Sequence, residues 1–375
     1  MRICFISAHN FSAPGGVRSH ILSLSKELRK KGHEVTILAP SLNGKKTEFN
    51  SGIDNLVEIG KTLLLPGNGA QFDFTFANKG QLKEFFKENK FDIYHFQNLS
   101  PMLSFNAKSI LKNEPTIVTI HTYQSGKISS KIVTSERIDR FTKGYNHRIF
   151  VSPSQKNFFE IMDKETYSVI PNGISLKHGM EFKSIKGKKE IRLLYLGRLE
   201  ARKGVGYAIK TFIELRKDQK YSNLKLDVVG SGDQKFIDSI EIPEKLKKDI
   251  VFHGRLSDSD VEQVRKNSDI YLAPATGGES FGIVLLEAMQ YGIPVVAFGN
   301  PGYKSVIEPN EILSWGLVEN MNLDAMVEKV KELLSSPERY EKLSKEGLEY
   351  VKNYDWVRLA DKIIDVYKNV LKQKN

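Results

Sequence analysis

The chain has 375 residues, which is too long for one ordinary hydrophobic core and predicts two domains of under about 200 residues each. Hydrophobic residues make up 40% and charged residues 27%, a composition that excludes long disordered tracts. The single cysteine excludes an internal disulfide bond, and no apolar run approaches the roughly 20 residues that a membrane span requires. We therefore expect a cytoplasmic protein.

The net charge of +11 is concentrated in the first half of the chain. Residues 1–175 hold 23 Lys and Arg against 15 Asp and Glu, whereas the remainder holds 33 against 30. Such an excess can attract an anionic membrane surface, nucleic acid or an acidic substrate. It is equally typical of a lysine-rich solvated surface.

Short apolar runs alternate with amphipathic stretches along the first half. A strand, a helix at 17–31 and a second strand predict a βαβ unit at the start of the chain. Strands are expected at 2–8, 34–39, 91–96, 116–120 and 148–152. We expect them to form a parallel sheet.

The same pattern restarts in the second half, after a polar segment at 176–190 that has five lysines and is expected to be the linker. Strands are expected at 191–196, 224–229, 250–253, 270–273 and 294–298. The fold class is thus α/β, with two doubly wound domains at 1–175 and 176–356 and a cleft between them. A last helix at 357–372 has a broad apolar face, and we expect residues 357–375 to return to the first domain.

Three loops that follow strands carry the candidate ligand-binding residues, because ligands of open α/β sheets bind beyond the carboxyl ends of the strands. Gly15 and Gly16 precede the first helix, where they would let a phosphate approach the backbone. The alternative interpretation is that they only form a tight turn. The motif is neither Gly-x-Gly-x-x-Gly nor a P-loop. Arg198 and Lys203 follow the strand at 191–196 and suit a diphosphate, although a solvated basic loop has the same composition.

The loop after the strand at 270–273 combines two carboxylates with a Gly-rich helix start. Glu279 stands where carboxylate and helix amides can both bind sugar hydroxyls, and Glu287 can accept hydrogen bonds from a ribose. Each glutamate alone is compatible with a helix cap or a solvent-facing residue. Asp258 and Asp260 superficially match an Asp-x-Asp metal motif but precede a helix, so we interpret them as a cap and expect no essential metal and no tightly bound cofactor.

Together these motifs resemble the family 4 retaining glycosyltransferases of the GT-B fold, and within them the phosphatidylinositol mannosyltransferases are most similar. The resemblance covers nearly the whole chain. It rests on Pro14-Gly15-Gly16-Val17, His121-Thr122, Pro171-Asn172-Gly173-Ile174, Gly197-Arg198, Lys203-Gly204, Glu279 through Glu287 with Ala288-Met289, and Gly292-Ile293-Pro294-Val295-Val296.

The resemblance implies a nucleotide-sugar donor bound chiefly by the second domain, GDP-mannose first and UDP-sugars next. It places Arg198 and Lys203 on the diphosphate, Glu279 on the transferred sugar and Glu287 on the ribose. It also implies roles for further residues: the amides around Phe281, Gly282 and Ile283 on sugar and phosphate, Gly15 and Gly16 closing over the donor from the first domain, His121 beside the reacting sugar, and Gly230, Arg255 and Leu256 on the nucleobase side. Transfer would proceed on the front face with retention of configuration.

The acceptor side is less defined by the sequence. Basic and apolar residues alternate over 126–156, which suits an amphipathic membrane-surface element or a solvated helix face. The resemblance favours a lipid or glycolipid acceptor and peripheral membrane binding. Gln97-Asn98 stands where those mannosyltransferases tend to carry an acidic residue, which puts inositol in doubt. A soluble sugar acceptor, a sugar-nucleotide epimerase of the same architecture and a nucleic-acid-binding protein are the alternatives, the last without a recognised binding module.

Overall fold

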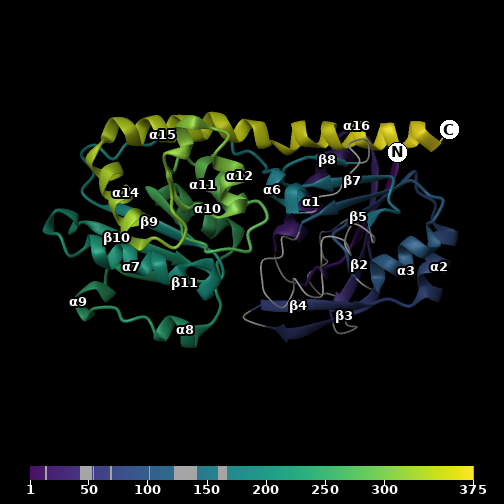
Figure 1. The fold of residues 1–375 in the computed structure, drawn as a ribbon, viewed down its shortest axis with the longest axis horizontal. Coiled ribbons are helices and arrows are strands. Elements are labelled where there is room, and N and C mark those ends of the chain that lie inside the picture. Colours follow the sequence, from purple (N-terminus) through teal and green to yellow (C-terminus); the bar gives the residue numbers. More distant parts are fainter. Residues whose placement is uncertain are drawn as a thin grey trace. The chain divides into compact units, whose positions relative to one another are not determined.

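The computed structural model describes residues 1–12, 15–42, 53, 55–67, 70–100, 102–121, 142–158 and 167–374. The chain forms two compact units, Met1–Ser175 with Trp356–Asn375 and Leu176–Asp355. Each unit is an α/β layer structure around one sheet (Figure 1). None of the helices in the described residues combines the length and apolar character that a membrane span requires.

The sheet of the first unit has the strand order β4-β3-β2-β1-β5-β6-β7-β8. Its strands are β1 (Arg2–Ser7), β2 (Glu34–Leu42), β3 (Leu56–Gly67), β4 (Ala70–Phe76), β5 (Ile93–Gln97), β6 (Thr116–Ile120), β7 (His147–Phe150) and β8 (Tyr167–Val169). All neighbours pair in parallel except β3 and β4, which pair antiparallel. The five strands expected for this sheet pair in parallel as predicted. The antiparallel pair β3 and β4 was not expected, although Asn68-Gly69 between two β-rich runs is a hairpin signal.

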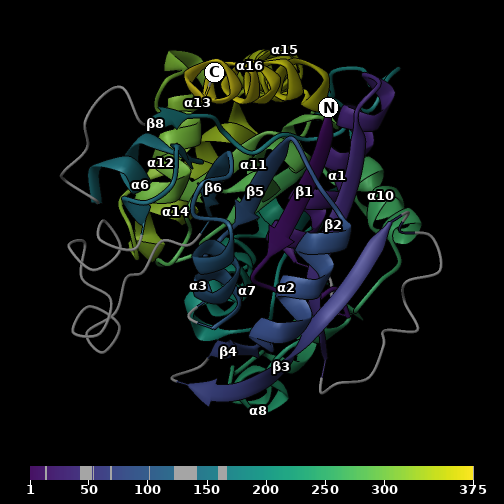
Figure 2. The same cartoon turned by 90° about the vertical axis from the view of Figure 1, so that its right-hand side faces the viewer.

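Alternate residues of the buried strands face two separate hydrophobic layers. Ile3 and Phe5 of β1 pack toward α1 (Gly16–Lys30) and α16 (Trp356–Lys374), whereas Cys4 and Ile6 face the opposite layer. That layer contains α2 (Lys79–Glu88) and α3 (Leu103–Ile110), which contact each other over the sheet (Figure 2). A further short helix, α6 (Pro153–Phe158), follows β7.

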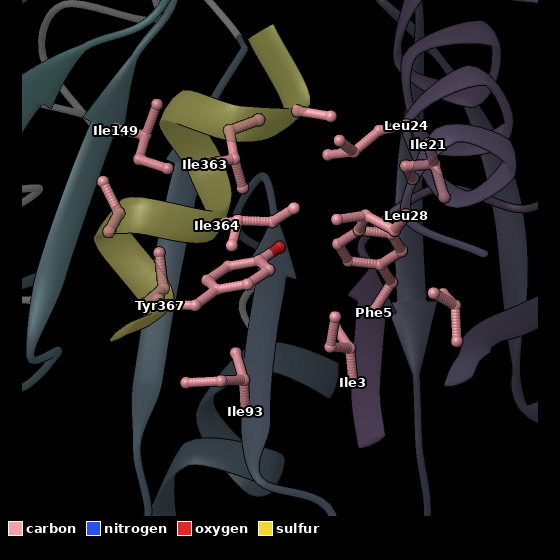
Figure 3. Close-up of a cluster of buried hydrophobic side chains, with 14 of the residues drawn as sticks. Ile3, Phe5, Ile21, Leu24, Leu28, Ile93, Ile149, Ile363, Ile364 and Tyr367 are labelled. Carbon is pink, nitrogen blue, oxygen red and sulfur yellow. The ribbon is translucent and has the colours of Figure 1, made fainter. Parts of the chain in front are cut away.

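The C-terminal helix belongs to the first unit, as the expected fold class requires. Ile363, Ile364 and Tyr367 of α16 face Ile21, Leu24 and Leu28 of α1 and the apolar residues of β1 (Figure 3). Burying each such side chain contributes about 1.5–3 kcal/mol. Trp356, at the start of α16, is 2% exposed and donates its backbone N–H to the carbonyl of Ile174 at 3.2 Å.

The sheet of the second unit is wholly parallel, with the order β11-β10-β9-β12-β13-β14. Its strands are β9 (Ile191–Leu196), β10 (Leu224–Val229), β11 (Ile250–Gly254), β12 (Ile270–Ala273), β13 (Val295–Phe298) and β14 (Leu317–Val318). Its helices are α7 (Val205–Leu215), α8 (Gln234–Asp238), α9 (Glu244–Lys247), α10 (Asp258–Asn267), α11 (Ile283–Met289), α12 (Pro301–Ile307), α13 (Glu311–Ser314), α14 (Leu323–Ser335) and α15 (Pro337–Tyr350). This is the 3-2-1-4-5-6 order of a dinucleotide-binding fold.

The segment at 176–190, which was expected to be the linker, packs on the second unit. Ile185 is buried, and Lys183 Nζ donates to the carbonyls of Arg265 at 3.2 Å and Lys266 at 2.7 Å. The lysine thus satisfies carbonyl groups that the end of α10 leaves without helical partners. The lysine-rich composition suggested a solvated linker, whereas one of these lysines caps a helix of the second unit.

Candidate functional site

The strand order of the second unit reverses between β9 and β12, and ligands of such sheets bind at this switch point. The two loops that leave the carboxyl ends of these strands are joined by one backbone hydrogen bond and one from a side chain. The N–H of Thr276 donates to the carbonyl of Arg202 at 3.0 Å, and Arg202 Nη1 donates to the carbonyl of Gly277 at 3.1 Å. The loops after β9 and β12 therefore form one rigid rim.

Gly204 permits the closest approach between these loops. Its φ is +80°, and a Cβ at this position would lie 1.9 Å from the carbonyl oxygen of Pro274. Only glycine meets both the left-handed conformation and the contact. The backbone geometry of this loop therefore requires the glycine that follows Lys203.

Lys203 and Glu279, predicted on separate loops, meet across the rim. Lys203 Nζ lies 2.5 Å from Glu279 Oε1, with side chains 22% and 14% exposed. Glu279 is not the cap of the following helix, because α11 begins at Ile283 with Gly282 as its N-cap. The carboxylate is therefore held at the rim by a cation rather than by a helix start.

Arg198 lies on the same loop and is 54% exposed, with Nη1 2.7 Å from Glu200 Oε1. The hydroxyl of Tyr195 donates to the carbonyl of Arg198 at 2.9 Å and lies 3.3 Å from the carbonyl of Lys203. Burial raises the pKa of this tyrosine well above its usual value, so the hydroxyl stays protonated as a donor. One buried hydroxyl thus ties together the backbone that carries both candidate phosphate ligands.

Glu287 pairs with a residue that the sequence did not single out. Arg265 Nη2 of α10 lies 2.5 Å from Glu287 Oε2 of α11, with side chains 14% and 30% exposed. No motif surrounds Arg265, because the contact depends on how two helices pack. Asp258 and Asp260 lie in the first turn of that same helix, so their interpretation as its cap is wrong: the N-cap is Ser257, whose side chain accepts from the N–H of Asp260.

The other residues predicted on the donor side lie around this rim. The N–H of Gly230 donates to the carbonyl of Gly254 at 2.8 Å, which joins the ends of β10 and β11. Arg255 is exposed and Leu256 half-buried just beyond β11. The side chain of Phe281 is buried with its ring centroid 5.9 Å from that of Tyr354, so this residue offers only its backbone to a ligand. Gly282 and Ile283 lead directly into α11.

The first unit has a corresponding switch point between β1 and β5. His121 follows β6 and is buried, with Nε2 2.8 Å from Gln97 Oε1 at the end of β5. Asn98 has a φ of +68° and directs Nδ2 to His9 Nε2 at 3.2 Å. Gly15 and Gly16 are exposed at the start of α1.

His20 is a further polar residue that the sequence analysis missed, since a lone histidine on an amphipathic helix gives no signal. Its ring lies 4.5 Å from the ring of His121 and 4.8 Å from Trp356, edge to face in both cases. Burial lowers its pKa to about 4 although Asn172 accepts a hydrogen bond from Nδ1, and burial lowers the pKa of His121 well below its usual value. Both rings are therefore neutral at pH 7.

The proposed membrane-surface element is only partly described. Its residues 126–141 lie outside the described residues. Within the described part, Arg148 is buried in β7 and donates from Nε to the carbonyl of Thr142 at 3.2 Å. Arg148, one of the basic residues of the 126–156 stretch, is therefore part of the interior of the first unit and does not contribute to a membrane-facing surface.

Comparison with known proteins agrees with this architecture. The family described as Glycosyltransferase Family 4 matches residues 14–178, and the family described as Glycosyl transferases group 1 matches residues 179–350. A phosphatidyl-myo-inositol mannosyltransferase of Mycobacterium leprae is 29% identical over 377 residues, which cover 99% of this chain and 97% of that protein. An uncharacterized glycosyltransferase of Haemophilus influenzae is 24% identical over 365 residues, which cover 96% of this chain and 98% of that protein.

Solved structures resemble the whole chain at low sequence identity. The pneumococcal O-GlcNAc transferase GtfA, in complex with UDP and GlcNAc, has a TM-score of 0.75 at 12% identity and covers 99% of both chains. A glycosyltransferase from Rickettsia africae has a TM-score of 0.71 at 19% identity and covers 99% of this chain and 98% of that one. The chain therefore belongs to the family 4 glycosyltransferases and has their GT-B fold of two Rossmann-like domains.

Proposed function

We propose that this glycosyltransferase moves a mannosyl group from GDP-mannose to a lipid or glycolipid acceptor, with retention of configuration, at a membrane surface. The observation that carries the donor side is the rim at the carboxyl ends of β9 and β12, where Lys203 and Glu279 meet. Mannose and a lipid acceptor are supported by the relatives named phosphatidyl-myo-inositol mannosyltransferases.

The charges at the rim fit a diphosphate leaving group. Lys203 forms an ion pair with Glu279, and Arg198 forms one with Glu200. A bound diphosphate would add negative charge where the two cations already stand, and their attraction to it grows as the glycosidic bond breaks. Arg198 and Lys203 thus act on the transition state more than on the bound donor.

The two glutamates have different tasks in this proposal. Glu279 accepts hydrogen bonds from hydroxyls of the transferred sugar, with its carboxylate held by Lys203. Glu287 accepts them from the ribose, with its carboxylate held by Arg265. Neither glutamate is assigned as a nucleophile, so the leaving diphosphate takes the proton of the incoming acceptor hydroxyl on the same face of the sugar.

Gln97, which raised doubt about inositol as the acceptor, contacts His121 instead of an open surface. The side chain of Gln97 is fully buried and hydrogen-bonded to His121. A glutamine in place of an acidic residue at this position therefore changes the surroundings of His121 rather than a surface that an acceptor would contact. Phosphatidylinositol remains the first acceptor to test. The basic first half of the chain suits an anionic lipid surface.

The proposal is tested by the thermal unfolding of the full chain with GDP, UDP, GDP-mannose and UDP-glucose. A ligand at 100 times its Kd stabilises by about 2.7 kcal/mol. For a unit of this size that raises Tm by about 5–10 °C. We expect the largest rise in Tm with GDP and GDP-mannose, and a Glu287→Gln variant should lose most of this rise. A larger rise with UDP and UDP-glucose would identify a UDP-sugar as the donor instead. No rise with any nucleotide would refute the proposal.

A further inference from the structure

A buried chain of polar side chains runs from the C-terminal helix to His121. Tyr367 Oη of α16 lies 2.7 Å from His95 Nδ1 of β5. His95 Nε2 lies 2.7 Å from Thr119 Oγ1 and 3.4 Å from Gln97 Nε2. Gln97 Oε1 in turn lies 2.8 Å from His121 Nε2. The tyrosine, both histidines and the glutamine are each at least nine-tenths buried, so water does not compete for these bonds.

The chemistry of the amide group determines where the protons lie in this chain. An amide oxygen only accepts, so His121 must donate from Nε2, and its Nδ1 is then the accepting nitrogen. An amide nitrogen only donates, so His95 Nε2 accepts from Gln97 and also from the hydroxyl of Thr119. The single proton of neutral His95 is therefore on Nδ1 and is donated to Tyr367.

The groups around His121 keep it in this neutral form. His20 of α1 lies 4.5 Å away ring to ring, and His9, beyond the end of β1, and His95, within β5, also act on it electrostatically. Burial and these three histidines lower its pKa, and among the residues that the structure describes no carboxylate contributes to this shift. A glutamine supplies an acceptor at this position without adding the charge that would protonate the imidazole.

We propose that Gln97 is a positioning residue that fixes His121 as the tautomer with its proton on Nε2, and that Tyr367 orients Gln97 through His95. The C-terminal helix thereby helps to determine which ring nitrogen of His121 carries the proton, in addition to packing on the sheet. The relevance of this tautomer to turnover rests on the proposed role of His121 beside the reacting sugar, whereas the tautomer itself does not.

The test is histidine nitrogen NMR of the full-length protein, with the His121 signals assigned by a His121→Asn variant. We expect the wild type to show protonated Nε2 and unprotonated Nδ1 at pH 7.5. In Gln97→Leu the Nδ1 proton should appear, and in Gln97→Glu the Nε2 proton should remain while the pKa of His121 rises. Tyr367→Phe should shift the signals of His95 and His121 together.

The matched control is Tyr340→Phe, which removes a buried hydroxyl that donates to the carbonyl of Asp269 at 2.7 Å in the second unit. It should leave the His121 signals unchanged. In transfer assays Gln97→Leu should lower kcat about tenfold at unchanged KM for the donor. Gln97→Glu should approach wild-type kcat at high pH and lose it as pH falls through the raised pKa.

Two results would overturn the inference: a wild-type His121 protonated on Nδ1, or a Gln97→Leu spectrum identical to wild type. If the spectra change as expected and the wild type transfers no sugar, the tautomer assignment holds and the proposed function fails. The two failures are therefore distinguishable.

Discussion

Replacing Lys203 by methionine separates its proposed catalytic role from its structural one. Methionine keeps most of the apolar stem of lysine but lacks the terminal ammonium group that lies 2.5 Å from Glu279, and both partners are largely desolvated at 22% and 14% exposed. Losing a charged hydrogen bond of this kind should lower the free energy of unfolding by about 1–3 kcal/mol. Losing a preorganised group that stabilises developing charge should raise the barrier by about 2.7–4 kcal/mol, a 100- to 1,000-fold fall in kcat.

The assay measures kcat at saturating GDP-mannose and the urea unfolding midpoint of the same preparation. Lys188→Met is the matched control, because Lys188 pairs with the buried Asp269 at the opposite, amino-terminal edge of the same sheet. It should lower stability and leave kcat within about twofold. A Lys203→Met enzyme with kcat within about threefold of wild type and a lowered unfolding midpoint would refute the catalytic assignment.

Three further predictions follow from described contacts. Gly204→Ala should lower the free energy of unfolding by more than about 2 kcal/mol, because the φ of +80° and the 1.9 Å approach to the facing loop both oppose a Cβ, and an unchanged urea midpoint would contradict this. Arg265→Gln should weaken GDP binding about three- to tenfold in calorimetry, because Glu287 loses the partner that orients it, whereas unaltered affinity would remove Arg265 from the site. The first unit should be the more acid-labile, because His20, His95 and His121 are buried neutral, with lowered pKa values, and the unfolded chain takes up protons below about pH 6.5. The free energy of unfolding therefore has its full value above that pH and falls below it by up to about 1.4 kcal/mol per pH unit for each histidine. The fluorescence of the two tryptophans, one in each unit, can follow the unfolding of each unit separately. Equal acid sensitivity of both units would contradict the prediction.

The parallel strands were predictable because buried β-rich runs are bounded by helices and turns. The ranges expected for β6, β9, β10 and β12 agree with the structure. The antiparallel pair β3 and β4 was missed although its sequence carries a signal. Asn68-Gly69 lies between two β-rich runs, and apolar and polar residues alternate along β4.

The candidate site divides in the same way between local and long-range features. Lys203 and Glu279 were identifiable because each stands in a local motif next to a strand end, although only the structure brings them together. Arg265 and His20 stand in no motif, and their partners lie 22 and 152 residues away in the chain. Pairings of this kind depend on how elements far apart in the chain pack together, which local sequence patterns do not encode.

The central claim is tested most directly by incubating the purified full chain with radiolabelled GDP-mannose and vesicles that contain phosphatidylinositol. The account predicts a mannosylated lipid that extracts with the vesicles and has the α configuration of the donor, and it predicts that Lys203→Met forms at least 100-fold less. Release of free mannose or of an epimerised sugar nucleotide without a lipid product, or a product of β configuration, would contradict it.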